Sequence, residues 1–160
     1  MHNNAGRVVQ INVSDGGVPK GPVPAARIDA DGVEGDRQQN RKVHGGPDRA
    51  VCLFAAEVID ALRREGHPIE AGSTGENLTI SGVDWAAVVP GSRLRIGPDV
   101  VLEITGYTAP CRWIAHAFAD GDFSRIAHAR HPGESRVYAR VLAEGRVTQG
   151  DAVEIMPAHG

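Results

Sequence analysis

Short apolar runs, separated by turn-forming residues, dominate the chain. The runs are rich in Val and Ile and are bounded by Gly, Pro or Asp, which is how β-strands appear in a sequence. Seven of them predict strands, at residues 7–13, 50–54, 77–81, 92–96, 100–105, 135–142 and 152–156. Their even spacing favours a mainly β fold in which the strands form a closed or nearly closed barrel, with a few short helices.

Residues 55–65 have helical rather than alternating periodicity. Val58, Ile59 and Leu62 fall on one helical face, and Gly66 supplies a C-terminal stop. We expect this helix to cover or plug one end of the barrel.

A second helix is predicted over residues 109–118. Its apolar residues share one side: Trp113, Ile114, Ala117 and Phe118. Thr108 is positioned as an N-cap, with Pro110 in the first turn. Cys111 would then lie near a helix N-terminus, where the positive end of the helix dipole and the adjacent Arg112 favour a thiolate.

A thiolate at Cys111 is open to three uses: ligand to a soft or high-valent metal, persulfide carrier, or covalent nucleophile. Cys52 lies inside the apolar run 50–54, where a cysteine is expected to be a small buried hydrophobe. These two cysteines are too few for a disulfide framework, an iron–sulfur cluster or a Cys-rich zinc site.

Length and composition narrow the class of protein. A chain of 160 residues fits one domain over residues 1–160, and the Gly/Pro-rich stretch 15–24 is interpreted as a mobile loop rather than a linker. The net charge of −3 argues against nucleic-acid binding. No apolar stretch is long enough for a membrane helix and no signal peptide is recognisable, so a cytoplasmic location is expected. The oligomeric state stays open.

The densest polar segment is 35–49. Its adjacent Gly45 and Gly46 allow backbone N–H groups to converge on an oxyanion, and His44 and several Arg and Lys side chains surround them. We interpret the segment as an anion site, with phosphate as the natural ligand. A solvated loop whose glycines serve a tight turn is the alternative.

Two further polar groups are candidates for a pocket. Glu76 and Asn77 enter a predicted strand and can read the edge of a heterocycle, although an Asn there also suits a turn that bonds its own backbone. Arg136, Tyr138 and Arg140 alternate along another strand and so share one face, which faces either solvent or a pocket.

Five segments, taken together and in this order, resemble the MOSC family, the molybdenum cofactor sulfurase C-terminal domain. They are Gly35-Asp36-Arg37, Val43-His44-Gly45-Gly46-Pro47-Asp48-Arg49-Ala50-Val51, Gly75-Glu76-Asn77-Leu78, Pro110-Cys111 and Tyr138-Ala139-Arg140-Val141-Leu142. The closing Gly145-x-Val147-x-x-Gly150-Asp151 belongs to the same pattern. The resemblance runs from about residue 7 to residue 156, and the co-occurrence of the segments is far more specific than any one of them.

The resemblance implies a β-barrel related to a domain of pyruvate kinase that binds the pterin molybdenum cofactor (molybdopterin). Relatives that are enzymes reduce N-hydroxylated compounds, including amidoximes and hydroxylaminopurines. By this resemblance Cys111 is the catalytic residue and the molybdenum ligand. The cofactor-binding residues would be His44, Gly45, Gly46, Arg49, Glu76, Asn77, Arg136 and Arg140.

The chain departs from larger relatives, because it has no additional N-terminal barrel region and no appended iron–sulfur domain. Reduction of a small N-hydroxylated substrate would therefore need a separate flavin or iron–sulfur electron donor. Pyridoxal phosphate is not expected, since the desulfurase-like part of some relatives is absent and neither Lys20 nor Lys42 has a Schiff-base setting. A sulfur-carrier or cofactor-transfer module using a Cys111 persulfide is the alternative function, and a barrel that has lost its ligand is a third.

Overall fold

The computed structural model describes residues 6–37 and 46–157. Its strands are β1 (Gly6–Val13), β2 (Gly21–Val23), β3 (Ala25–Asp29), β4 (Gly32–Val33), β5 (Val51–Ala55), β6 (Leu78–Ser81), β7 (Arg93–Ile96), β8 (Val100–Tyr107), β9 (Val137–Ala143), β10 (Gly145–Thr148) and β11 (Ala152–Ile155). The helices are α2 (Ala56–Arg64) and four 3-10 turns: η1 (Pro47–Arg49), η2 (Trp85–Ala87), η3 (Arg112–Ala117) and η4 (Phe123–Ile126).

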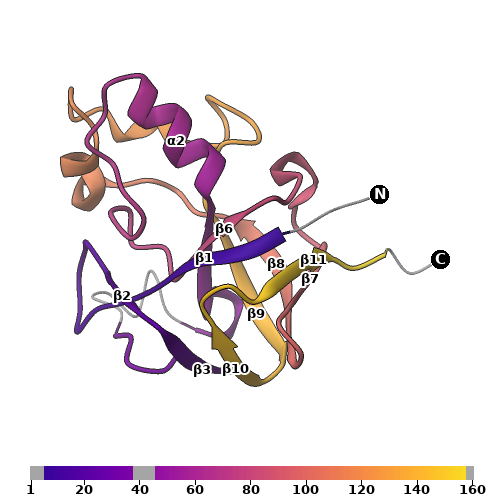
Figure 1. The fold of residues 1–160 in the computed structure, drawn as a ribbon. Helices are drawn as coiled ribbons and strands as arrows, with labels where there is room; N and C mark the ends of the chain where they lie inside the picture. Colours follow the sequence, from indigo (N-terminus) through magenta and orange to yellow (C-terminus); the bar gives the residue numbers. More distant parts are fainter. Residues whose placement is uncertain (1–5, 38–45, 158–160) are drawn as a thin grey trace.

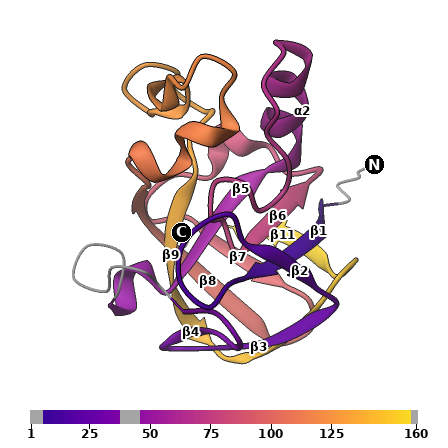
Figure 2. The same ribbon diagram turned by 90° about the vertical axis from the view of Figure 1, so that its left-hand side faces the viewer.

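Seven strands close into a barrel, which confirms the predicted mainly β class (Figures 1 and 2). Their order is β11-β7-β8-β9-β5-β6-β1, and β1 then pairs with β11 to complete the ring. All these pairings are antiparallel except that of β5 with β6, which the intervening helix α2 allows to run parallel. A second, three-stranded sheet has the order β10-β3-β4.

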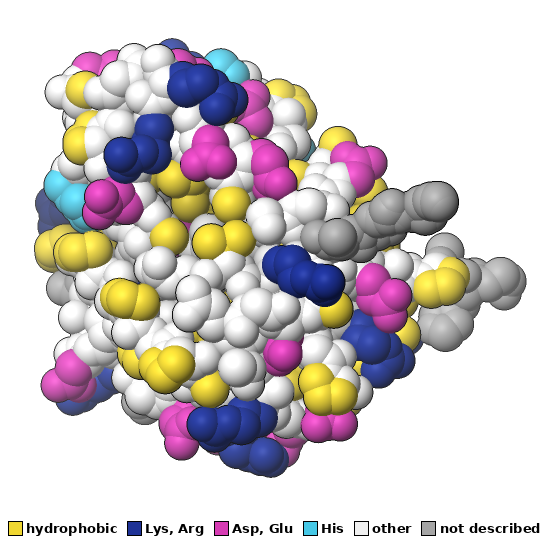
Figure 3. Space-filling model, viewed as in Figure 1, with side chains coloured by type: hydrophobic (Ala, Val, Ile, Leu, Met, Phe, Trp, Pro, Cys, Tyr) yellow, Lys and Arg dark blue, Asp and Glu magenta, His cyan; other side chains and the backbone are white. Residues whose placement is uncertain are grey.

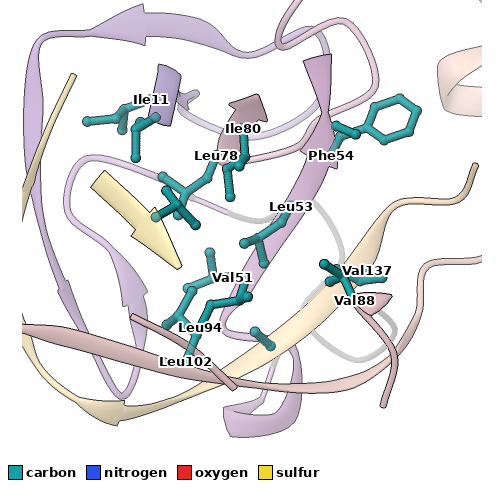
Figure 4. Close-up of a cluster of buried hydrophobic side chains, with 14 of the residues drawn as sticks. Ile11, Val51, Leu53, Phe54, Leu78, Ile80, Val88, Leu94, Leu102 and Val137 are labelled. Carbon is teal, nitrogen blue, oxygen red and sulfur yellow. The ribbon is translucent and has the colours of Figure 1, made fainter. Parts of the chain in front are cut away.

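Branched apolar side chains fill the barrel (Figure 4). Ile11, Leu53, Leu78 and Leu102 come from four different strands, and none has measurable exposure. Burying each such side chain stabilises the fold by about 1.5–3 kcal/mol. All seven predicted strands are confirmed. They could be predicted because the apolar residues that face the barrel interior form a regular pattern in the sequence.

Helix α2 follows β5 directly and lies at one end of the barrel (Figures 1 and 2). Val58, Ile59 and Leu62 are its buried residues, as predicted. The chain leaves the helix at Gly66, whose φ of 100° is in the left-handed region that favours glycine. The segment with η3 and η4 lies beside it, and Arg125 forms a two-pronged ion pair with Glu65.

The predicted helix over 109–118 is wrong. Thr108 continues the sheet, since its N–H donates to the carbonyl of Arg136 at 2.9 Å, and it does not cap a helix. Only the 3-10 helix η3 follows. Residues 15–24 also differ from the prediction of a mobile loop, because β2 within them pairs with β1.

Within the described residues, none of the helices has the length and apolar character that crossing a membrane requires. On the face shown in Figure 3, Lys and Arg side chains are interspersed with Asp and Glu. That face carries no extended patch of one charge.

Candidate active site

A cavity of about 300 Å³ lies where β5, β9 and the loops before β2, β6 and η3 meet. Its lining residues are Gly17, Val18, Lys20, Arg37, Cys52, Thr74, Gly75, Asn77, Thr108, Ala109, Cys111, Trp113, Ile114, Arg136 and Tyr138. Thiols, cations and aromatic rings therefore line one cavity. This combination suits an anionic ligand with a planar part and a soft-metal or electrophilic centre.

Cys111 lines this cavity and is partly buried. It stands just before η3 with an extended backbone (φ −142°, ψ 174°). Because η3 is a short 3-10 turn, the predicted stabilisation of a Cys111 thiolate by a helix dipole loses its basis. The place of Cys111 in the cavity is what supports a chemical role.

Cys52 also lines the cavity, which the sequence reading missed. Its side chain is buried as predicted, and its Sγ lies 3.7 Å from Oγ1 of Thr108. Burial raises the pKa of the Cys52 thiol, although the charge of Arg136 opposes the shift. Cys52 is therefore a neutral thiol at physiological pH.

The two thiols should differ in reactivity. Iodoacetamide at pH 8 is expected to modify Cys111 in the native protein and to spare Cys52 until the protein unfolds, because burial raises the pKa of the Cys52 thiol and keeps it from the reagent. Mass spectrometry of tryptic peptides across a pH series measures both rates. Equal rates at pH 8 would contradict the placement of Cys52.

Asp36 holds two cavity-lining side chains together. Its Oδ2 accepts hydrogen bonds from Lys20 Nζ at 2.7 Å and from Asn77 Nδ2 at 2.9 Å, while its Oδ1 accepts from the backbone N–H of Ser14 at 3.0 Å. The Lys20 and Asp36 side chains are only 9% and 6% exposed, so the ion pair is buried. The backbone of Lys20 is also held, because its backbone N–H donates a hydrogen bond to the carbonyl oxygen of Gly72 at 2.9 Å.

Asn77 lines the cavity, but its side chain also serves the fold. Its Oδ1 accepts from the N–H of Cys52 at 3.0 Å, which joins the entry of β6 to β5. Glu76, which was predicted to bind the cofactor, is fully buried and does not line the cavity. Its carboxylate accepts hydrogen bonds from Gly72 N, Thr74 Oγ1 and Thr79 Oγ1. Glu76 thus shapes the loop that carries Thr74.

Arg136 is a buried, cavity-lining cation with unused hydrogen-bonding capacity. It is 5% exposed and its Nη1 donates to Thr74 O at 2.6 Å. Its Nε is buried and has no hydrogen-bond partner among the residues that the structure describes. A buried donor without a partner costs about 1–3 kcal/mol.

Tyr138, two residues further along β9, also lines the cavity. Burial raises the pKa of Tyr138 to about 12, so its hydroxyl stays protonated. Arg49 of η1 does not line the cavity; it is exposed, and its guanidinium lies 5.3 Å from the centre of the Tyr138 ring.

Arg140 is not brought into this cavity. It lies further along β9, is exposed, and forms ion pairs with Glu103 and Asp48. Gly46 precedes η1 and does not line the cavity either. His44 and Gly45 lie outside the described residues, so their predicted role stays a prediction. No group of three or more His, Cys, Asp or Glu residues suited to a metal ion occurs in the described part of the chain.

The family model described as the MOSC domain matches residues 40–154. The uncharacterized protein YflK of Bacillus subtilis is 32% identical over 142 residues, which are 88% of this chain and 63% of YflK. A protein named "Reductase" from Gibberella moniliformis is 28% identical over 79% of this chain and 23% of its own length. The chain thus spans less than two thirds of either relative.

Solved structures have the same fold. The crystal structure of YiiM from Geobacillus stearothermophilus superposes with a TM-score of 0.75 at 25% identity, covering 95% of this chain and 75% of that chain. The overall fold is therefore shared with a known protein.

Proposed function

Because the chain belongs to the MOSC domain family, we propose that it binds a pterin molybdenum cofactor and reduces N-hydroxylated compounds, with Cys111 as the molybdenum ligand. The observation that carries the proposal is one cavity that is lined by both Cys111 and the buried cation Arg136. A thiolate is a suitable ligand for molybdenum, and a guanidinium is suited to a phosphate.

The residues present fit such a cofactor. The Arg136 guanidinium lines the cavity and can pair with an anionic group, and the Lys20 ammonium keeps donors beyond the one it gives to Asp36. The Tyr138 ring lines the same cavity and offers an aromatic surface to a heterocycle. The half-exposed indole of Trp113 offers a flat apolar surface at the cavity.

When bound, the cofactor supplies a metal centre that takes up oxygen from an N–O bond and exchanges two electrons. Overall, an N-hydroxylated substrate, two electrons and two protons give the reduced nitrogen compound and water. Cys111 would hold the metal at the cavity, and Lys20 and Arg136 would hold the anionic part. We propose that a separate flavin or iron–sulfur protein supplies the electrons.

The name of one relative supports a redox role. The fungal relative carries the printed name "Reductase", and this chain matches only 23% of it. That name favours an oxidoreductase over the sulfur-carrier alternative for the part of the fungal protein that this chain matches.

The direct test is cofactor analysis of protein purified from a host that makes the cofactor. Molybdenum by elemental analysis and pterin by fluorescence of its oxidation product should be stoichiometric, and a chemically reduced sample should convert an amidoxime or a hydroxylaminopurine. Protein with sulfane sulfur on Cys111 and no molybdenum would instead favour the carrier function. Protein with neither would overturn both.

Arg136→Met should weaken cofactor retention about tenfold to a hundredfold, because a charge-assisted hydrogen bond contributes about 1.5–3 kcal/mol. Pterin content after extended dialysis measures it. Arg95→Met on β7 is the matched control, since Arg95 pairs with Glu154 on the surface. Equal pterin content in wild type and Arg136→Met would exclude an anion contact by Arg136.

A further inference from the structure

One stretch of chain between β8 and β9, residues 108–136, builds a large part of the cavity wall. Cys111 lies near its start and Arg136 at its end, and both line the cavity. The stretch contains η3 and η4 but no strand, so sheet hydrogen bonds do not fix its course between the two ends. Contacts with the rest of the fold must therefore hold Cys111 in its place.

The 3-10 helix η3 links Cys111 to a contact with helix α2. Cys111 is the residue just before η3, and Phe118 is the residue just after it. Ile114 and Ala117 bury the inner side of η3, but apolar packing has no directional preference of its own. A directional contact is needed to fix the position of the turn along its axis.

His67, just beyond the end of α2, supplies this contact. Its Nδ1 accepts a hydrogen bond from the backbone N–H of Ala119 at 3.1 Å. Its ring also meets the Phe118 ring edge-on, with centroids 5.4 Å apart and an interplanar angle of 69°. The backbone N–H of His67 donates to the carbonyl of Leu62 at 3.1 Å, which anchors His67 to the helix. One side chain therefore ties the far end of η3 to α2.

The contact with Ala119 fixes the protonation state of His67. A backbone N–H can only donate, so Nδ1 must accept and carries no proton. The ring proton then lies on Nε2, which is 3.6 Å from Oε1 of Glu65. A hydrogen bond from Arg125 lowers the pKa of the Glu65 carboxyl, so this neighbour of His67 is an anion.

The charged and titratable groups around His67 come from three parts of the chain. Glu65 follows α2, Arg125 belongs to η4, and His131 and Glu134 lie in the turns after η4. Arg125 pairs with Glu65 at 2.7 Å and with Glu134 at 3.0 Å. The charge of Glu65 is thus balanced by Arg125, and His67 can stay neutral beside it.

We propose that neutral His67 is a positioning residue for Cys111, because it holds η3 in the place that keeps this thiol in the cavity. A second proton on the ring would lie on Nδ1 and face the N–H of Ala119, so that two donors would oppose each other. Acidification should therefore release the end of η3 and expose Cys111. The importance of this position for catalysis rests on the proposed function, whereas the positioning itself does not.

The test measures the thiol directly, in the full chain from a host that lacks the cofactor. The rate at which Cys111 reacts with a pyridyl disulfide is followed between pH 8 and pH 5, the range in which histidines change charge. His67→Asn puts an amide oxygen close to the place of Nδ1 and does not titrate. The ratio of the wild-type rate to the His67→Asn rate cancels the ionisation of the thiol. It should rise about three- to tenfold on acidification, as expected for the loss of one hydrogen bond.

Two further variants complete the test. His67→Leu removes the acceptor and should react about three- to tenfold faster than wild type already at pH 8, with faster amide hydrogen exchange at Ala119. His116→Asn is the matched control, because His116 is exposed on η3 and its ring bonds to Trp113 O in the same turn. It should keep the wild-type pH profile.

A wild-type to His67→Asn ratio that does not change with pH would overturn the proposal, and so would a His67→Leu rate equal to that of wild type. Either result would leave the proposed molybdenum chemistry of Cys111 untouched. In contrast, the expected rates in a protein that binds no molybdenum would support the positioning role of His67 and contradict only the proposed function.

Discussion

Replacing Cys111 by serine is expected to abolish molybdenum binding while the protein stays folded. A serine hydroxyl does not ionise near neutral pH, so the variant loses the charged, soft ligand that molybdenum requires. Lys20 and Arg136 are unaffected, and part of the pterin should therefore be retained. The measurement is the ratio of molybdenum to pterin in protein from a cofactor-proficient host.

The fold should tolerate this change because Cys111 is only partly buried and the two side chains differ by one atom. The free energy of unfolding in urea should stay within about 0.5 kcal/mol of wild type. A Cys111→Ser protein with wild-type molybdenum would refute the assignment of Cys111 as the ligand. A variant that loses both molybdenum and stability would point to misfolding, and Cys111→Ala would then separate the two effects.

Asp36→Asn should lower the free energy of unfolding by about 3–5 kcal/mol, the usual effect of removing one partner from a buried ion pair. The amide has the shape of the carboxylate but only one acceptor oxygen. Lys20 and Asn77 donate to one carboxylate oxygen and Ser14 donates to the other. In either orientation, the new NH2 group therefore faces a donor. Urea denaturation measures the loss.

A double-mutant cycle with Lys20→Met sharpens this prediction. Lys20→Met alone leaves the Asp36 carboxylate without its cation, so the double variant should be less destabilised than the sum of the single variants. Asp15→Asn is the matched control, since its carboxylate is 93% exposed and 3.7 Å from Arg37. Its effect should be under about 0.5 kcal/mol. Additive losses would show that Asp36 and Lys20 act independently.

The sequence predicted the barrel strands because each buries a visible set of apolar residues. Four strands escaped it: β2, β3, β4 and β10. β2 has only three residues and β4 only two, whereas β3 and β10 pair with each other from opposite ends of the chain. The helix predicted over 109–118 failed for another reason. Ile114, Ala117 and Phe118 are buried as the apolar pattern suggested, but Trp113 is 51% exposed, and only the short 3-10 helix η3 forms.

The site was only partly predictable. Cys111, Asn77 and Arg136 line the cavity as expected, whereas Arg140 lies further along β9 and pairs on the surface. Lys20 was considered only as a Schiff-base residue, and its place in the cavity depends on a contact with Asp36 that no local pattern encodes. The family segment Gly35-Asp36-Arg37 was the one available signal.

Closure of the barrel between β1 and β11 also constrains how the protein is made. The contacts Gly6↔Val153 and Arg7↔Ala152 join the first and last strands of the sheet. During synthesis β1 leaves the ribosome before β11. The β1 edge that pairs with β11 therefore stays unpaired until residues 152–155 have been made. The nascent barrel therefore passes through a stage with an open strand edge, which is where chaperone binding would protect it.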